Sequence, residues 1–213
     1  MQVFLLITAA WVFSVCLHEF GHALVAYKGG DHTVKEKGYL TLNPIHYTHP
    51  VYSLVLPLVF LMMGGIGLPG GAVYINDNLL RSKGWRTAVS LAGPAMNLLL
   101  ALLLCIPFWL GVIDDNFGPA LAFLIELQIW AVLFNLIPVP PLDGFNALAP
   151  WMPQEIVERV RENSMIFMWI LFLVVWNVPA FGNLVGGVLS GLGISRYEAY
   201  QGYVQFQFWK HSS

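Results

Sequence analysis

The chain of 213 residues has little charge and almost no cysteine. Only 10% of its residues are Asp, Glu, Lys or Arg and 57% are hydrophobic, which leaves too few polar side chains to cover a sizeable soluble domain. The formal net charge of −2 offers no basic surface, so no nucleic-acid partner is expected. The two cysteines, Cys16 and Cys105, lie in apolar runs, so we expect small core residues rather than a disulfide or a metal pair.

The sequence consists largely of long apolar runs, and its mean hydropathy is +0.67. We therefore expect an all-α polytopic membrane protein with about five to six transmembrane helices. The runs expected to enter the membrane are about 1–27, 51–67, 87–112, 119–137, 164–178 and 180–194. The last two runs flank Pro179 and are short, so they form either a tight hairpin or one broken unit.

Polar and glycine-rich segments between these runs predict the topology. Residues 28–50 contain three lysines and an alternating pattern, which predicts a short cytoplasmic hairpin of extended chain and places the N-terminus outside. A second basic cluster at residues 81–86 lies on the same side only if the chain turns back between residues 68 and 80. We expect a Gly-rich re-entrant or extended segment there, whose free backbone groups can pair with an extended peptide.

The first apolar run ends with His18, Glu19 and His22, groups that a membrane tolerates only for a reason. Residues four apart share a helix face, so the two imidazoles can close on one metal ion. Glu19 points about 100° away from His18 and can polarise a water held there. The motif sits on the order of 25 Å along the helix from Gln2, inside the far leaflet. The alternative is a coincidental spacing of polar groups at the wet end of a span.

Two histidines leave a catalytic zinc one protein ligand short, because such sites use three protein groups and keep one position for water. We expect Asp143 to be the third, since a proline-extended stretch returns it to the leaflet of the histidines. The alternative for Asp143 is an ordinary Asp-Gly turn.

Glu126 is the rival third ligand, because it lies deep in the fourth run. It precedes Asn135 by nine residues, a helical offset of about 180°, so only one of the two can face the site. Asn135 leads directly into the Asp143 stretch, so we assign Glu126 a structural role, paired with Gln128 or a neighbouring span. His46 and His49 are further candidates, in a loop polar enough to solvate them.

Four motifs follow one another along the chain. They are His18-Glu19-Phe20-Gly21-His22, Leu40-Thr41-Leu42-Asn43-Pro44, Leu91-Ala92-Gly93-Pro94-Ala95-Met96-Asn97 and Phe134-Asn135-Leu136-Ile137-Pro138-Val139-Pro140-Pro141-Leu142-Asp143-Gly144. Together they resemble the site-2 protease family of intramembrane zinc metalloproteases, and most of all its compact prokaryotic branch without a PDZ or CBS domain. The likeness makes 1–150 the expected intramembrane metalloprotease core and 151–213 a C-terminal part with a surface helix, a short apolar hairpin and an interfacial aromatic tail.

The resemblance also implies roles for single residues. One Zn²⁺ per chain is implied on His18, His22 and Asp143, with Glu19 as general base. Substrate contacts are implied for Asn135, Gly70, Gly71, Ala72 and Val73. The implied substrates are transmembrane proteins or peptides, cleaved in or near their membrane segments. The implied location is the cell (cytoplasmic) membrane, with the active site toward the cytoplasm.

Two other functions use the same residues. A metal-ion transporter would hold its ion on the same ligands but needs a polar path on the outer side, where the sequence offers only Asp114 and Asp115. An inactive relative that binds membrane partners has no need for Glu19 beside the metal. Both interpretations are weaker than a protease.

Overall fold

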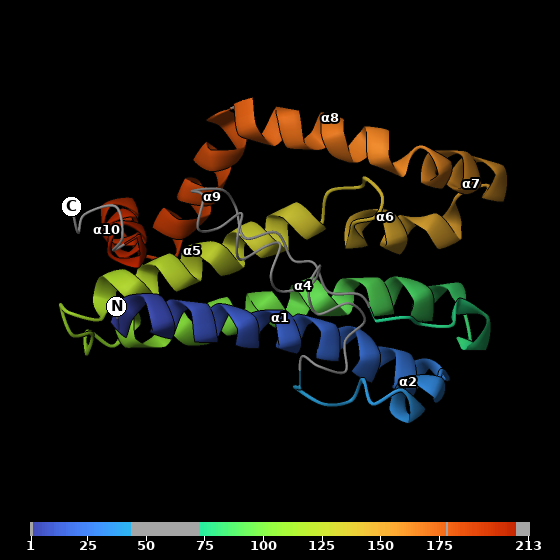
Figure 1. Cartoon of the computed structure of the whole chain (residues 1–213), viewed down its shortest axis with the longest axis horizontal. Coiled ribbons are helices and arrows are strands. Elements are labelled where there is room, and N and C mark those ends of the chain that lie inside the picture. The colour runs from blue at the N-terminus through green and yellow to red at the C-terminus, as the bar shows by residue number, and fades with distance from the viewer. Residues whose placement is uncertain (1, 44–72, 178, 208–213) are drawn as a thin grey trace.

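The structure is a computed structural model that describes residues 2–43, 73–177 and 179–207. Within these ranges every regular element is a helix, as the sequence predicts (Figure 1). The helices are α1 (Gln2–Gly29), α2 (Thr33–Glu36), η3 (Asp77–Leu79), α4 (Lys83–Trp109), α5 (Gly118–Asn135), α6 (Asp143–Leu148), η4 (Ala149–Trp151), α7 (Gln154–Glu162), α8 (Ser164–Asn177), α9 (Pro179–Gly191) and α10 (Arg196–Phe206).

Three of the described helices, α1, α4 and α5, are long and apolar enough to cross a membrane. The pair α8 and α9 adds a fourth candidate if it is counted as one span, and it is bent by 69° at the break. A pair with this bend is either a broken span or a re-entrant loop. The predicted run 51–67 and the Gly-rich residues 68–72 lie outside the described residues.

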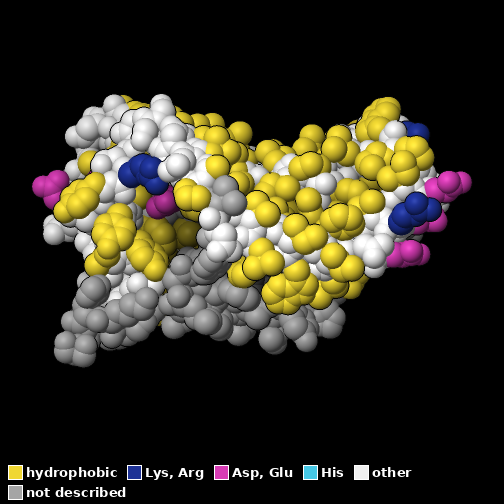
Figure 2. Space-filling view, turned by 90° about the horizontal axis from the view of Figure 1, so that it is seen from above, with side chains coloured by type: hydrophobic (Ala, Val, Ile, Leu, Met, Phe, Trp, Pro, Cys, Tyr) yellow, Lys and Arg dark blue, Asp and Glu magenta, His cyan; other side chains and the backbone are white. Residues whose placement is uncertain are grey.

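The outward face of α4 is apolar, as a lipid-facing surface must be. Seven of its large hydrophobic side chains are each more than a third exposed: Leu91, Leu98, Leu99, Leu102, Leu103, Ile106 and Trp109. Figure 2 shows hydrophobic side chains across the middle of one face of the molecule and charged ones mainly toward its two ends. A bilayer covering the middle of the molecule accounts for this distribution.

Helices α1, α4 and α5 lie side by side and form the centre of the molecule (Figure 1). A glycine allows the closest approach between α1 and α4. A Cβ added at Gly21 would lie 2.6 Å from Met96 Cγ and 2.9 Å from the Ala92 carbonyl oxygen. Because Gly21 lies between the two histidines of α1, this contact presses the polar end of α1 against the middle of α4.

The predicted extended hairpin at residues 28–50 is wrong for its described part, which contains α2. The Asp31 carboxylate accepts hydrogen bonds from both the backbone N–H and the hydroxyl of Thr33, which closes a turn just before α2. Val34 and Tyr39 are both buried in the same hydrophobic cluster. The alternating residue types wrongly predicted a strand. A single helical turn, and not a pleated strand, brings the side chains of Val34 and Tyr39 into one cluster.

The C-terminal tail also differs from the interfacial anchor that its aromatic residues predict. Helix α10 packs across α5 and touches α1. Phe206 is fully buried, with its ring centroid 5.2 Å from that of Phe4 and 5.9 Å from that of Phe123. Tyr197 and Tyr200 remain more than half exposed. One face of α10 is therefore core, and only its other face is free for an interface.

Candidate active site

His18 and His22 of α1 meet Asp143 of α6 at a candidate metal centre. The two Nε2 atoms of the histidines are 3.0 Å apart. Asp143 Oδ2 lies 3.2 Å from His18 Nε2, and Oδ1 lies 3.4 Å from His22 Nε2. Among the described residues, these three form the group of His, Cys, Asp or Glu side chains whose ligand atoms all lie within 4.8 Å of one another. Their number and type suit one zinc ion with a fourth position open.

The hydrogen bonds of His22 show which ring nitrogen faces this centre. Its Nδ1 lies 2.7 Å from the backbone carbonyl oxygen of Val89. A carbonyl oxygen only accepts, so Nδ1 carries the proton and the lone pair of Nε2 points inward. Asp143 Oδ2 is also buried there and accepts no hydrogen bond, although His18 Nε2 is close. Electron-rich atoms gathered in this way are stabilised by a cation, so the donor set fits a divalent metal.

A glycine keeps the space around these atoms open. Gly93 of α4 lies directly against the imidazoles, and a Cβ added there would run into the Nε2 atoms of both His22 and His18. Any larger residue would therefore fill the position between the two ring nitrogens. This close approach explains why the third motif carries glycine before Pro94.

Asp143 is held by contacts around the start of α6. A Cβ at Gly144 would collide with the Leu136 carbonyl, so glycine alone lets α6 begin this close to the end of α5. The Asn146 amide donates to the Pro141 carbonyl, and the Thr87 hydroxyl of α4 donates to the Ala147 carbonyl. Asp143-Gly144 thus begins a helix, and the expectation of a turn is wrong because this close contact, rather than local turn preference, sets the backbone.

A cleft of about 890 Å³ contains the centre. Glu19 is 3% exposed and lines it together with the two histidines. Asn135 lines it from the end of α5, where its amide donates to the Ala131 carbonyl. Val73 lines it from the segment before η3, whereas Gly70, Gly71 and Ala72 lie outside the described residues.

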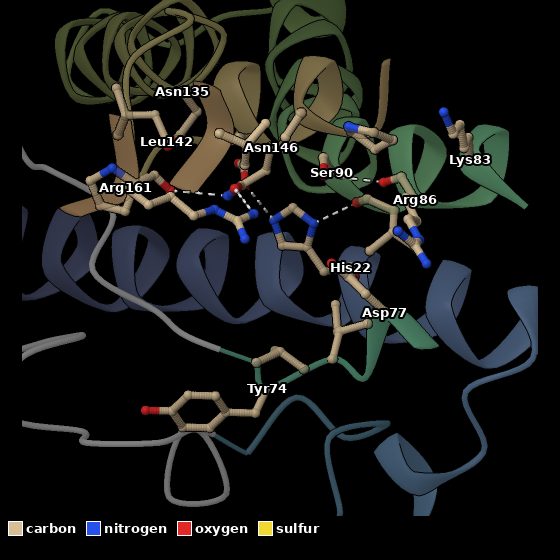
Figure 3. Close-up of a pocket in the computed structure, with 18 of the residues that line it drawn as sticks. His22, Tyr74, Asp77, Lys83, Arg86, Ser90, Asn135, Leu142, Asn146 and Arg161 are labelled. Carbon is tan, nitrogen blue, oxygen red and sulfur yellow. Dashed lines mark hydrogen bonds and ion pairs between the residues drawn. The ribbon is translucent and has the colours of Figure 1, made fainter. Parts of the chain in front are cut away.

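Figure 3 shows cationic side chains on both sides of the histidines. Arg161 lies on one side of His22, next to Asn146, and Arg86 and Lys83 lie on the other. Charged side chains therefore form part of the lining of the cleft.

Comparison with known proteins identifies the chain. Residues 6–113 match the sequence profile of Peptidase family M50. Several relatives carry the name zinc metalloprotease Rip2. The one from Mycolicibacterium smegmatis is 42% identical over 218 residues, which cover 97% of this chain and 82% of the relative. The one from Mycobacterium tuberculosis strain H37Rv is 42% identical over 216 residues, with the same coverage. The chain belongs to peptidase family M50.

A third relative extends the likeness beyond the mycobacteria. YwhC of Bacillus subtilis, also a zinc metalloprotease by name, is 32% identical over 183 residues, 79% of this chain and 78% of the relative. No solved structure matches the chain. The site-2 protease resemblance is thus confirmed, and the protein is an intramembrane zinc metalloprotease.

The rival third ligand of this M50 protease lies elsewhere. Glu126 interacts with the Trp130 indole and with the charge of Arg196 on α10, and it does not line the cleft. Its expected partner Gln128 instead accepts a hydrogen bond from Asn97. Of the two partners expected for Glu126, Gln128 is therefore wrong, because the two side chains leave α5 in different directions. A neighbouring helix instead supplies Arg196. His46 and His49 lie outside the described residues.

The two cysteines of the M50 protease are buried in hydrophobic clusters, as predicted. Cys16 is 2% exposed and Cys105 is fully buried. Neither belongs to the group of potential metal ligands.

Sequence reasoning missed two residues beside the centre. Asn97 Oδ1 lies 2.6 Å from His18 Nδ1, and the Asn97 amide donates to Gln128. Both amides lie inside predicted spans, where a polar side chain signals function by default. The motif containing Asn97 supported the family resemblance. The contacts of Asn97 with His18 of α1 and Gln128 of α5 could not be predicted from the sequence of that motif alone.

Proposed function

We propose that His18, His22 and Asp143 hold one Zn²⁺ and that Glu19 is the general base for hydrolysis of a peptide bond in or near a substrate's transmembrane segment. The convergence of the three ligand atoms beneath Gly93 is the observation that carries this proposal. The zinc metalloprotease names of the relatives support zinc over other divalent metals. They also favour a protease over a metal-ion transporter or an inactive relative.

The residues of the cleft divide the chemistry among them. Bound zinc supplies a Lewis acid that lowers the pKa of water toward about 7 and polarises a carbonyl. Glu19 takes the proton of the attacking water and passes it to the leaving amine, so that its carboxylate is regenerated. Asn135 carries an amide at the edge of the cleft, and we assign it to the substrate peptide near the scissile carbonyl.

A helical substrate hides its carbonyls in hydrogen bonds, so it must unwind before attack. The segment 73–76 supports a role in this step. The Lys37 ammonium donates to the Tyr74 carbonyl, and the Asn76 N–H donates to Asp31, so this chain is fixed at the rim of the cleft. We propose that it and residues 70–72 align the substrate by strand addition.

The orientation follows from the basic residues at the cleft end of the molecule. Lys28, Lys35, Lys37 and Arg81 flank the ends of α1 and α4 nearest the centre. Positive residues remain on the cytoplasmic side of a membrane, so we propose that the cleft opens toward the cytoplasm and that the N-terminus lies outside. We further propose five to six spans in all and a division between core and C-terminal part near residue 150.

The test compares wild type with Glu19→Gln in purified, detergent-solubilised protein and in cells. We expect Glu19→Gln to keep its zinc, measured by elemental analysis, and to lose cleavage, so that uncleaved membrane peptides accumulate in cells. Glu126→Gln is the matched control. It neutralises an acid of α5 whose side chain does not line the cleft. Full peptidase activity in Glu19→Gln would remove the general base from the proposal.

A further inference from the structure

We infer that Asn97 and Gln128 are positioning residues that select the tautomer of His18 and so hold its Nε2 ready for metal. The inference rests on the proposed metal site, because it concerns how one of the three ligands is prepared. It assigns a role to two buried amides that take no part in the proposed hydrolysis.

The three side chains form a chain across three helices. His18 of α1 reaches Asn97 of α4 over 2.6 Å, and Asn97 reaches Gln128 of α5 over 2.8 Å. Their exposed fractions are 3%, 4% and 1%. At such burial the hydrogen bonds are not exchanged with water, so each amide is held in one orientation by its partner.

The orientation of Asn97 decides where the proton of His18 lies. Gln128 presents its carbonyl Oε1, which only accepts, so the N–H₂ group of Asn97 faces α5. The Asn97 carbonyl Oδ1 then faces His18, and Nδ1 must be the donor. The lone pair of His18 Nε2 consequently points toward His22 and Asp143.

The opposite orientation would disable the ligand. If the N–H₂ of Asn97 turned toward His18, Nδ1 would have to accept, and the proton would move to Nε2 at the metal position. His22 runs no such risk, because its partner is the main-chain carbonyl of Val89, which cannot turn over. Of the two histidines, only His18 therefore depends on Gln128 to fix the orientation of the Asn97 amide.

The first measurement is the zinc dissociation constant of the purified full chain, by competition with a chromogenic chelator. Asn97→Leu removes the acceptor and should weaken zinc binding about 10-fold to 100-fold, the usual effect of losing such a partner. Asn97→Asp keeps an acceptor toward His18, and Gln128 can donate to the new carboxylate. We expect it to bind zinc like wild type, which a role in packing alone would not predict.

The second measurement is a double-mutant cycle. Gln128→Leu frees Asn97 to turn over and should weaken zinc binding. In the Asn97→Asp background the same change should have no effect, because a carboxylate has no N–H to present in either orientation. Equal losses in the two backgrounds would overturn the inference, as would Asn97→Asp binding zinc as weakly as Asn97→Leu. If Asn97→Leu does not fold, this cycle decides alone.

Two controls separate this inference from the proposed function. Ser14→Ala removes another buried hydrogen bond of α1, to the Trp11 carbonyl, and should leave zinc affinity unchanged. His18→Ala should abolish tight binding. Unchanged zinc affinity in His18→Ala would refute the metal site itself. If His18→Ala loses zinc but Asn97→Leu and Gln128→Leu both bind it like wild type, only the positioning role of Asn97 and Gln128 is refuted.

Discussion

At the scale of single residues, the site depends as much on a missing side chain as on the ligands. Gly93 leaves room between the two imidazoles, and Gly21 lets the helix that carries them reach α4. Both glycines lie in motifs that can be recognised in the sequence. The need for glycine at these positions comes from the close approach of α1 and α4, which the sequence does not show.

Gly93→Ala should abolish zinc binding, because the added methyl group would occupy the space beside both Nε2 atoms. Zinc per chain, measured by elemental analysis after dialysis, tests this expectation. Gly187→Ala is the matched control, since a Cβ at this position of α9 meets nothing within 4 Å. Full zinc content in Gly93→Ala would mean that the ion lies elsewhere.

Asp143→Ala should lower zinc occupancy while leaving the chain folded, because the carboxylate is one of three proposed ligands and belongs to the first residue of a short helix. Asp77→Asn serves as the control, as this acid lines the same cleft outside the ligand group. Equal zinc content in both variants would exclude Asp143 from the metal.

The histidine pair and Glu19 could be proposed from the sequence because helix periodicity and residue chemistry are local properties. Asp143 could be proposed because the proline-extended stretch returns it to the leaflet of the histidines, as the family resemblance also implies. Asn97 and Gln128 could not be given roles, because they acquire them only through a contact between α4 and α5. The same limit explains the wrong partner for Glu126, whose neighbour Arg196 comes from α10.

At the scale of elements, long helices were predictable and short ones were not. The apolar runs 87–112 and 119–137 correspond to α4 and α5, with ends shifted by one to four residues. The start of α4 is set by Ser82, whose hydroxyl accepts a hydrogen bond from the Trp85 N–H. Helices α2 and α6 are set by Asp31 and by the close contact at Gly144, and neither produces periodicity in the sequence.

Helix α10 should contribute to stability through its contact with α5. A Cβ at Gly202 would run into the Pro119 carbonyl, so Gly202→Ala should destabilise the protein by about 1–3 kcal/mol. Thermal unfolding in detergent measures the effect. Tyr197→Ala, on the exposed face of the same helix, should stay within about 0.5 kcal/mol of wild type. Equal stability of Gly202→Ala and wild type would show that α10 can shift away from α5 without cost.

At the scale of the whole molecule, the polar cleft and the apolar face predict how the protein sits in the bilayer. Single cysteines introduced at Asp115 and at Glu158 report the two ends, because both positions are exposed and the native cysteines are buried. An impermeant maleimide should label Asp115→Cys on intact cells and Glu158→Cys only after lysis. The reverse pattern would invert the proposed orientation.

The three proposed metal ligands come from the first helix and from a short helix that follows the fourth predicted run. During synthesis the histidines enter the bilayer long before the ribosome has made Asp143. A nascent or prematurely terminated chain therefore has only two of the three ligands, and peptide cleavage must wait until translation has passed α6.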